Sequence, residues 1–178
     1  MSNRLLARNA AYQKQVENLL DALASHDDAT LNLRPPNGGW SVVQVMHHLI
    51  VSEELSYRYV QKKLSFNPEL KNAGLVEWLR EQLLWFYLHV PIKFKAPTIV
   101  SDENLPEYAT LTETQARWLK AREAWVIFFN NLPPEIAQKV VYRHPLAGRL
   151  GWSGLITFFT THFNRHLKQI HRTLAQAV

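Results

Sequence analysis

The chain has 178 residues, of which 47% are hydrophobic and 20% charged. This length and composition indicate a single folded domain over residues 1–178 and differ clearly from those of a disordered chain. Because the sequence has no cysteine, disulfides, thiolate zinc sites and a cysteine nucleophile are excluded.

Four long helices and one shorter helix are expected, in agreement with the small number of glycines. The first long helix, residues 4–24, carries leucine, tyrosine and valine at helical spacing. A loop rich in Asp, Asn, Pro and Gly follows it. The second long helix is expected to begin after Ser41 as N-cap and to run to about residue 64, before Pro68. The shorter helix, residues 74–89, ends at Pro91.

An irregular stretch, residues 95–113, separates the shorter helix from the next long one. That helix begins at Thr112, is rich in tryptophan and phenylalanine, and ends at Pro133 and Pro134. An extended piece with a turn at 145–148 then precedes the last helix.

Ser153 is the expected N-cap of this last helix, which runs from residue 154 to about residue 174. The elements together predict an all-α bundle with a long irregular loop before its third or fourth helix.

Two of the eight histidines lie four residues apart in the last helix. This spacing places His162 and His166 on one face, in the same stripe as Leu155 and Phe159, which must face the core. Two buried imidazoles at van der Waals range cannot both be charged, and each ring nitrogen needs a partner. A divalent metal would satisfy both rings.

The second helix offers two neighbouring candidates for a third ligand. Helical phase places His48 about 100° from the centre of the apolar stripe and His47 about 140° away on the other side, further towards solvent. The phase favours His48 and leaves His47 as the alternative. Of the other histidines, His26 and His171 are expected at the surface. Structural roles are expected for His89, at a helix end, and for His144, in a turn.

Several catalytic motifs are missing. The glutamate of a HExxH zinc site is replaced by Phe163, and no GxSxG, P-loop or GxGxxG pattern occurs. Because the motif supplies no general base, a metal-bound water or hydroxide is the expected base or nucleophile.

The basic balance and the N-terminus bear on partners and location. The net charge is +5, but the basic residues are scattered and form no nucleic-acid motif. A solvated mixed-charge surface is therefore favoured. The alternative, a nucleic-acid groove, is supported only by the high pI. The N-terminus lacks an apolar signal region, and no apolar stretch approaches ~20 residues. We therefore expect a cytoplasmic protein that binds neither nucleic acid nor membrane.

Two segments resemble the signature of the DinB/YfiT-like superfamily. The first is GGWSVVQVMHHLIVSEE, with a Trp-Ser helix start, a His-Leu pair and a Glu. The second is HPLAGRLGWSGLITFFTTHFNRHLKQI, with a His-Pro turn, a His-x-x-x-His helix and a Gln-Ile pair. The resemblance covers nearly the whole chain.

This resemblance implies a four-helix bundle of up-down-down-up type, often dimeric, with a three-histidine site that commonly holds nickel or zinc. The ligands it implies are His48, His162 and His166, the same residues that helical phase favours. Trp40, Ser41 and Glu53 match family positions that look structural. Asn164, Gln169 and Glu53 are the candidates for groups that support the ligands.

Characterised members of the family include bacillithiol transferases and mycothiol-dependent isomerases. The resemblance therefore implies thiol S-transfer or hydrolysis on a small electrophilic substrate, with a low-molecular-weight thiol as a further cofactor. Arg143, Arg149 and Arg165 could bind an acidic cofactor, but a solvated surface is favoured. The alternative function is a non-catalytic, stress-related binding or scaffold bundle whose histidines are structural or relict.

Overall fold

The computed structural model of the chain describes residues 3–36, 38–90 and 105–176. In chain order its elements are α1 (Asn3–Leu23), α2 (Asp28–Asn32), α3 (Val42–Ser65), α4 (Leu75–His89), α5 (Leu111–Asn130), the 3-10 turn η3 (Pro134–Ile136), β1 (Val140–His144), β2 (Gly148–Gly151) and α6 (Trp152–Ala175). The expected helices are all present close to their predicted bounds. Helix α2 is not among the expected elements; it is a single turn whose N-cap Asp27 accepts a hydrogen bond from the amide of Thr30.

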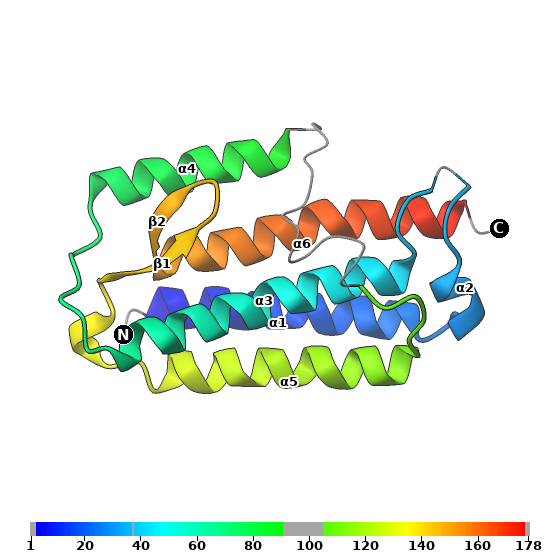
Figure 1. Ribbon diagram of the computed structural model, residues 1–178, viewed down its shortest axis with the longest axis horizontal. Helices are drawn as coiled ribbons and strands as arrows, with labels where there is room; N and C mark the ends of the chain where they lie inside the picture. The colour runs from blue at the N-terminus through cyan, green and yellow to red at the C-terminus, as the bar shows by residue number, and fades with distance from the viewer. Residues whose placement is uncertain (1–2, 37, 91–104, 177–178) are drawn as a thin grey trace.

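Helices α1, α3, α5 and α6 form a four-helix bundle in which α5 and α6 each pack against both α1 and α3. Helices α1 and α6 run in one direction and α3 and α5 in the other, so the order is up-down-down-up (Figure 1). The predicted all-α bundle is confirmed, with one addition. Strands β1 and β2 pair antiparallel as a hairpin at the expected turn, 145–148.

Helix α4 lies outside the bundle, against α6 and β2 (Figure 1). Of the long irregular stretch that precedes α5, residues 95–104 lie outside the described residues, and 105–110 form neither helix nor strand. The described part of the loop therefore leads into the third bundle helix. Among the described residues, no helix combines the length and the apolar character needed to cross a membrane.

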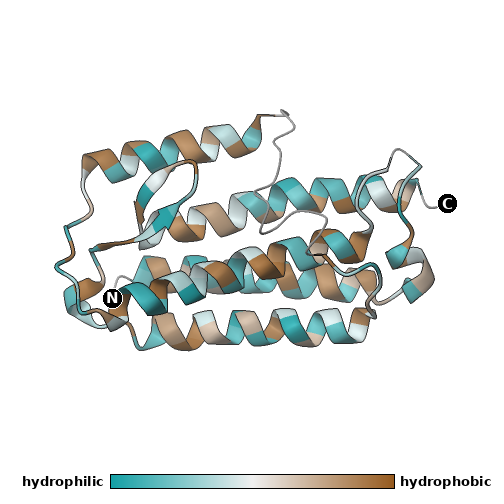
Figure 2. Cartoon of the chain, viewed as in Figure 1, coloured by the Kyte–Doolittle hydropathy of each residue, from teal (hydrophilic) through white to brown (hydrophobic). Residues whose placement is uncertain are grey.

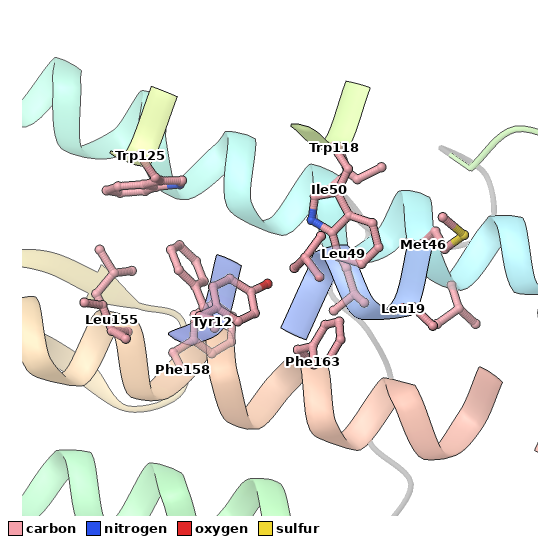
Figure 3. Packing of buried hydrophobic residues seen from close by; sticks show 14 of the residues in the cluster. Tyr12, Leu19, Met46, Leu49, Ile50, Trp118, Trp125, Leu155, Phe158 and Phe163 are labelled. Atoms are coloured by element: carbon pink, nitrogen blue, oxygen red, sulfur yellow. The ribbon is translucent and has the colours of Figure 1, made fainter. Parts of the chain in front are cut away.

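Aromatic side chains fill much of the space between the bundle helices. Figure 3 shows Tyr12 of α1 and Phe163 of α6 facing Trp118 and Trp125 of α5, and all four are buried. Buried apolar residues recur at helical spacing on one face of each bundle helix. Burial of these faces drives the helices together.

A buried ion pair crosses this apolar core. The Arg122 guanidinium donates to Glu53 Oε2 at 2.8 Å, and both side chains are buried. Glu53 Oε1 also accepts hydrogen bonds from the Tyr12 hydroxyl at 2.6 Å and from the Trp118 indole at 3.0 Å. Burial, and next the Glu53 charge, raise the pKa of Tyr12 well above its ordinary value. The network joins α1, α3 and α5.

The helix starts agree with the sequence at α3 but not at α6. The Ser41 hydroxyl accepts from the Gln44 amide and the Gln44 side chain accepts from the Ser41 amide, which forms a capping box. Helix α6 begins at Trp152 with Gly151 as N-cap, so the prediction of Ser153 as N-cap is wrong. The hairpin carries the chain directly into the helix two residues earlier than expected.

Candidate metal centre

Three imidazoles from α3 and α6 meet at one point. The Nε2 atom of His162 lies 3.1 Å from Nε2 of His48 and 3.0 Å from Nε2 of His166. One ring nitrogen from each of the three residues can be chosen so that all lie within 4.8 Å of one another. The structure thus brings together the three histidines that the sequence favours.

Local structure explains this convergence. His162 and His166 are one turn apart on α6, so their rings lie on the same face. The capping box at Ser41 fixes the start of α3, and His48 follows two turns later on the side that packs against α6. His48 is 4% exposed.

Two aromatic rings border the imidazoles. Phe158, one turn before His162 on α6, stacks on its ring with centroids 5.1 Å apart and planes at 14°. The Trp40 ring lies 4.9 Å from the His48 ring and is nearly parallel to the His166 ring at 6.4 Å. These contacts restrict the rotation of the three imidazoles. From the sequence, Trp40 is expected only at a helix start, and nothing near it indicates its contact with the histidines. The four-residue spacing from Phe158 to His162 does indicate that these two rings share a face of α6.

The protein environment keeps two of the imidazoles neutral. Burial, followed by the neighbouring His166 and His48, holds the pKa of His162 well below its ordinary value. Burial lowers the pKa of His166 to about 3. Neutral imidazole is the form that binds a metal, because one ring nitrogen then has a free lone pair.

Gln169 determines which nitrogen of His166 faces the centre. The His166 Nδ1–H donates to Gln169 Oε1 at 2.9 Å, so in the neutral ring the lone pair is on Nε2. A hydrogen bond of this kind orients a metal-binding histidine and raises its basicity.

The other two candidates for support of the ligands lie elsewhere. Asn164 follows His162 by two residues, about 200° around the helix, so its side chain leaves α6 on another side. Glu53 is engaged in the ion pair with Arg122. Of the three candidates, only Gln169 has a hydrogen bond to one of the three histidines within the described part of the chain.

His47 is buried, so its expected position towards solvent is wrong. Arg117 Nη1 donates to His47 Nδ1 at 3.1 Å, and the His47 Nε2–H therefore donates to Thr114 Oγ1 at 3.2 Å. Helix α5 covers this side of α3, which explains the burial. Burial, and next the Arg117 charge, lower the pKa of His47. His47 is thus held by α5, away from the three converging imidazoles.

The remaining histidines are distributed as expected. His26 and His171 are exposed, and the His89 Nδ1–H donates to the Trp85 carbonyl at the end of α4. His144 is buried at the end of β1, and burial lowers its pKa to about 4.

The ring of His144 organises the hairpin turn. Its Nδ1 accepts the backbone N–H groups of Leu146 and Ala147, each at 3.2 Å. In the neutral ring the proton therefore resides on Nε2. This is a structural role, as expected from the sequence.

The three arginines considered for an acidic cofactor do not form one site. Arg143 and Arg149 are exposed and face each other across the hairpin. Arg165 donates to the carbonyls of Leu88 and Val90 at 3.3 and 3.0 Å, which ties the end of α4 to α6.

The histidine arrangement fits a divalent transition metal. Two nitrogens that each lie about 2.0–2.1 Å from one ion are about 3 Å apart when their bonds to it are close to perpendicular, and the two Nε2 separations are 3.1 and 3.0 Å. Imidazole is a preferred donor for zinc, nickel, copper and iron. Within the described residues no carboxylate joins the three-histidine group.

Comparison with known proteins places the chain in a family. The family model described as the DinB superfamily matches residues 11–170, which include all three histidines. No curated protein and no solved structure matches the chain.

Proposed function

The chain belongs to the DinB superfamily, and from this premise we propose that it is a metal-dependent enzyme with His48, His162 and His166 as ligands. The observation that carries the proposal is the convergence of three Nε2 atoms, with separations of 3.1 and 3.0 Å about His162. Nickel and zinc are the proposed metals, because three imidazole ligands suit both and the family resemblance implies them.

The proposed reaction is thiol S-transfer to, or hydrolysis of, a small electrophilic substrate. A divalent ion held by three imidazoles supplies Lewis acidity and lowers the pKa of a bound water or thiol towards neutrality. Three protein ligands are typical of catalytic zinc sites, which keep a coordination position for solvent or substrate, whereas structural sites have four.

The side chains around the three histidines orient their rings for metal binding. Gln169 fixes the tautomer of His166, and the rings of Phe158 and Trp40 restrict the imidazoles. Because the pKa values of His162 and His166 are low, protons do not compete for these two rings at neutral pH.

Turnover by the metal-loaded full-length chain tests this function. The protein is stripped with chelator, reloaded with zinc or nickel, and mixed with a panel of low-molecular-weight thiols and the electrophile monobromobimane. We expect adduct formation faster than the uncatalysed reaction, with the enhancement lost on stripping and in His48→Ala but kept in the control His171→Ala. A chromogenic ester serves as substrate for hydrolysis in a parallel assay. Metal binding without rate enhancement in either assay would favour the non-catalytic binding bundle.

A further inference from the structure

Helix α4 has its polar side towards the protein and its apolar side towards solvent. On the inner side Glu81 Oε1 accepts hydrogen bonds from Ser153 at 3.0 Å and from Thr157 at 2.5 Å, and only Leu84 is fully buried. The outer side has seven large apolar residues, each 48–71% exposed: Leu75, Val76, Trp78, Leu79, Leu83, Trp85 and Phe86. The helix lies on the outside of the bundle (Figure 1), and Figure 2 shows brown apolar segments along its length.

The exposed apolar surface is too large for an ordinary monomer face. A whole aromatic side chain has about 150–250 Å² of surface and Leu and Val have less, so the seven residues together expose on the order of 700 Å². The largest apolar patch on a typical monomer is about 300–600 Å². One side of a standard protein interface is about 800 Å². The outer face of α4 therefore supplies most of the surface that one partner of a stable dimer needs.

The spacing of these residues fits pairing between two helices. We define the α4 stripe by a heptad-like series within about 120° of arc: Leu75, Trp78, Leu79, Gln82, Trp85 and Phe86. Gln82, near the middle of the helix, is the only polar member of the stripe.

We propose that the α4 stripe pairs antiparallel with the α4 stripe of a second copy, about a twofold axis near Gln82. An isologous contact requires a self-complementary surface. About Gln82 the stripe is symmetric, since Leu79 then faces the partner's Trp85 and Trp78 faces the partner's Phe86. The two Gln82 amides face each other at the axis, where each can donate and accept a hydrogen bond.

Charge favours a protein partner over a membrane surface. A helix that lies on a lipid surface carries Lys and Arg beside its apolar face. The only Lys or Arg of α4 is Arg80, which forms an ion pair with Glu77 at 3.5 Å, on the side away from the stripe. The dimer does not rest on the metal-site proposal, and its test needs no metal.

Sedimentation of the full-length, metal-free protein tests the dimer. The chain has a mass of 20.7 kDa, so we expect a species of twice that mass at micromolar concentration. The double variant Trp78→Ser with Phe86→Ser is expected to raise the dimer Kd about 100-fold or more. The control Ile127→Ser, an exposed apolar residue on α5, is expected to leave it unchanged.

Disulfide cross-linking tests the geometry. Since the chain has no cysteine, Gln82→Cys introduces a single thiol, which is expected to form a covalent dimer rapidly under mild oxidation. The matched control Leu75→Cys should not cross-link, because an antiparallel pair places the two copies of residue 75 about 20 Å apart along the helices.

Three results would overturn the proposal. One is a monomeric wild type, including a monomer that binds vesicles of phosphatidylglycerol and phosphatidylcholine, which would assign the stripe to a lipid surface. Another is a dimer that the double variant leaves intact. The third is cross-linking of Leu75→Cys as fast as that of Gln82→Cys.

Discussion

The Nε2 atoms of His48 and His162 lie 3.1 Å apart, although 114 residues separate the two histidines in the chain. His166 Nε2 lies 3.0 Å from the same atom of His162. The Nε2 atom of His162 carries either one proton or one lone pair, so at any moment it can form a well-directed hydrogen bond with only one of these two neighbours. A divalent cation would satisfy all three nitrogens at once, which is the physical reason for the metal site that we propose at this point.

Substitution of Gln169 is expected to weaken metal binding without loss of the fold. Gln169→Ala removes the acceptor for His166 Nδ1–H, and loss of such a partner typically costs 10–100-fold in metal affinity. Competition with a chromophoric chelator measures the Kd for zinc. The neighbouring exposed Lys168→Ala serves as control. A Kd for Gln169→Ala equal to that of the control would remove the orienting role.

Loss of the buried carboxylate of Glu53 is expected to destabilise the bundle strongly. Glu53→Ala leaves the buried Arg122 guanidinium without its charged partner, which costs about 3–5 kcal/mol. The adjacent Glu54→Ala removes a partly exposed pair with Arg117 and is expected to cost no more than about 1 kcal/mol. Urea unfolding gives both values. Equal losses in the two variants would refute the assignment of Glu53 as the central member of the core network.

The metal-free protein is expected to lose stability as the pH falls below about 6.5. Burial lowers the pKa of His144 to about 4 and that of His166 to about 3, whereas an unfolded histidine titrates near 6.5. Between these values the unfolded chain binds more protons, so stability is complete above about pH 6.5 and falls as the pH decreases.

A variant isolates the contribution of His144. Each such histidine adds a slope of up to about 1.4 kcal/mol per pH unit. His144→Gln is expected to have a shallower decline between pH 6.5 and pH 4 in urea unfolding with chelator present. A decline as steep as that of the wild type would show that His144 is not held neutral by the fold.

Hydrophobic periodicity was sufficient to predict the long helices and the phase of two histidines of the candidate metal centre. Leu155 and Phe159 define the core side of α6, and His162 and His166 follow at four-residue steps. On α3 the same helical phase favours His48, which does lie against His162. It also places His47 towards solvent, whereas His47 is buried. Phase on one helix does not show that a second neighbour, α5, covers the other side.

Contacts between distant segments could not be predicted from local pattern. The ion pair of Glu53 with Arg122 joins residues 69 apart, and nothing near either residue signals the other. The start of α6 depends on the pairing of β1 with β2, which brings Gly151 to the N-cap position in place of Ser153. The orientation of α4 depends on the polar side chains of α6 that it meets, such as Thr157.

The most direct test of the metal centre is the metal content of protein purified without a nickel column and reloaded with zinc. Elemental analysis is expected to give about one ion per chain for the wild type and for His171→Ala. His162→Ala, which removes the central imidazole, is expected to retain less than about a tenth of that amount after dialysis. An unchanged metal content in His162→Ala would contradict the assignment of this site.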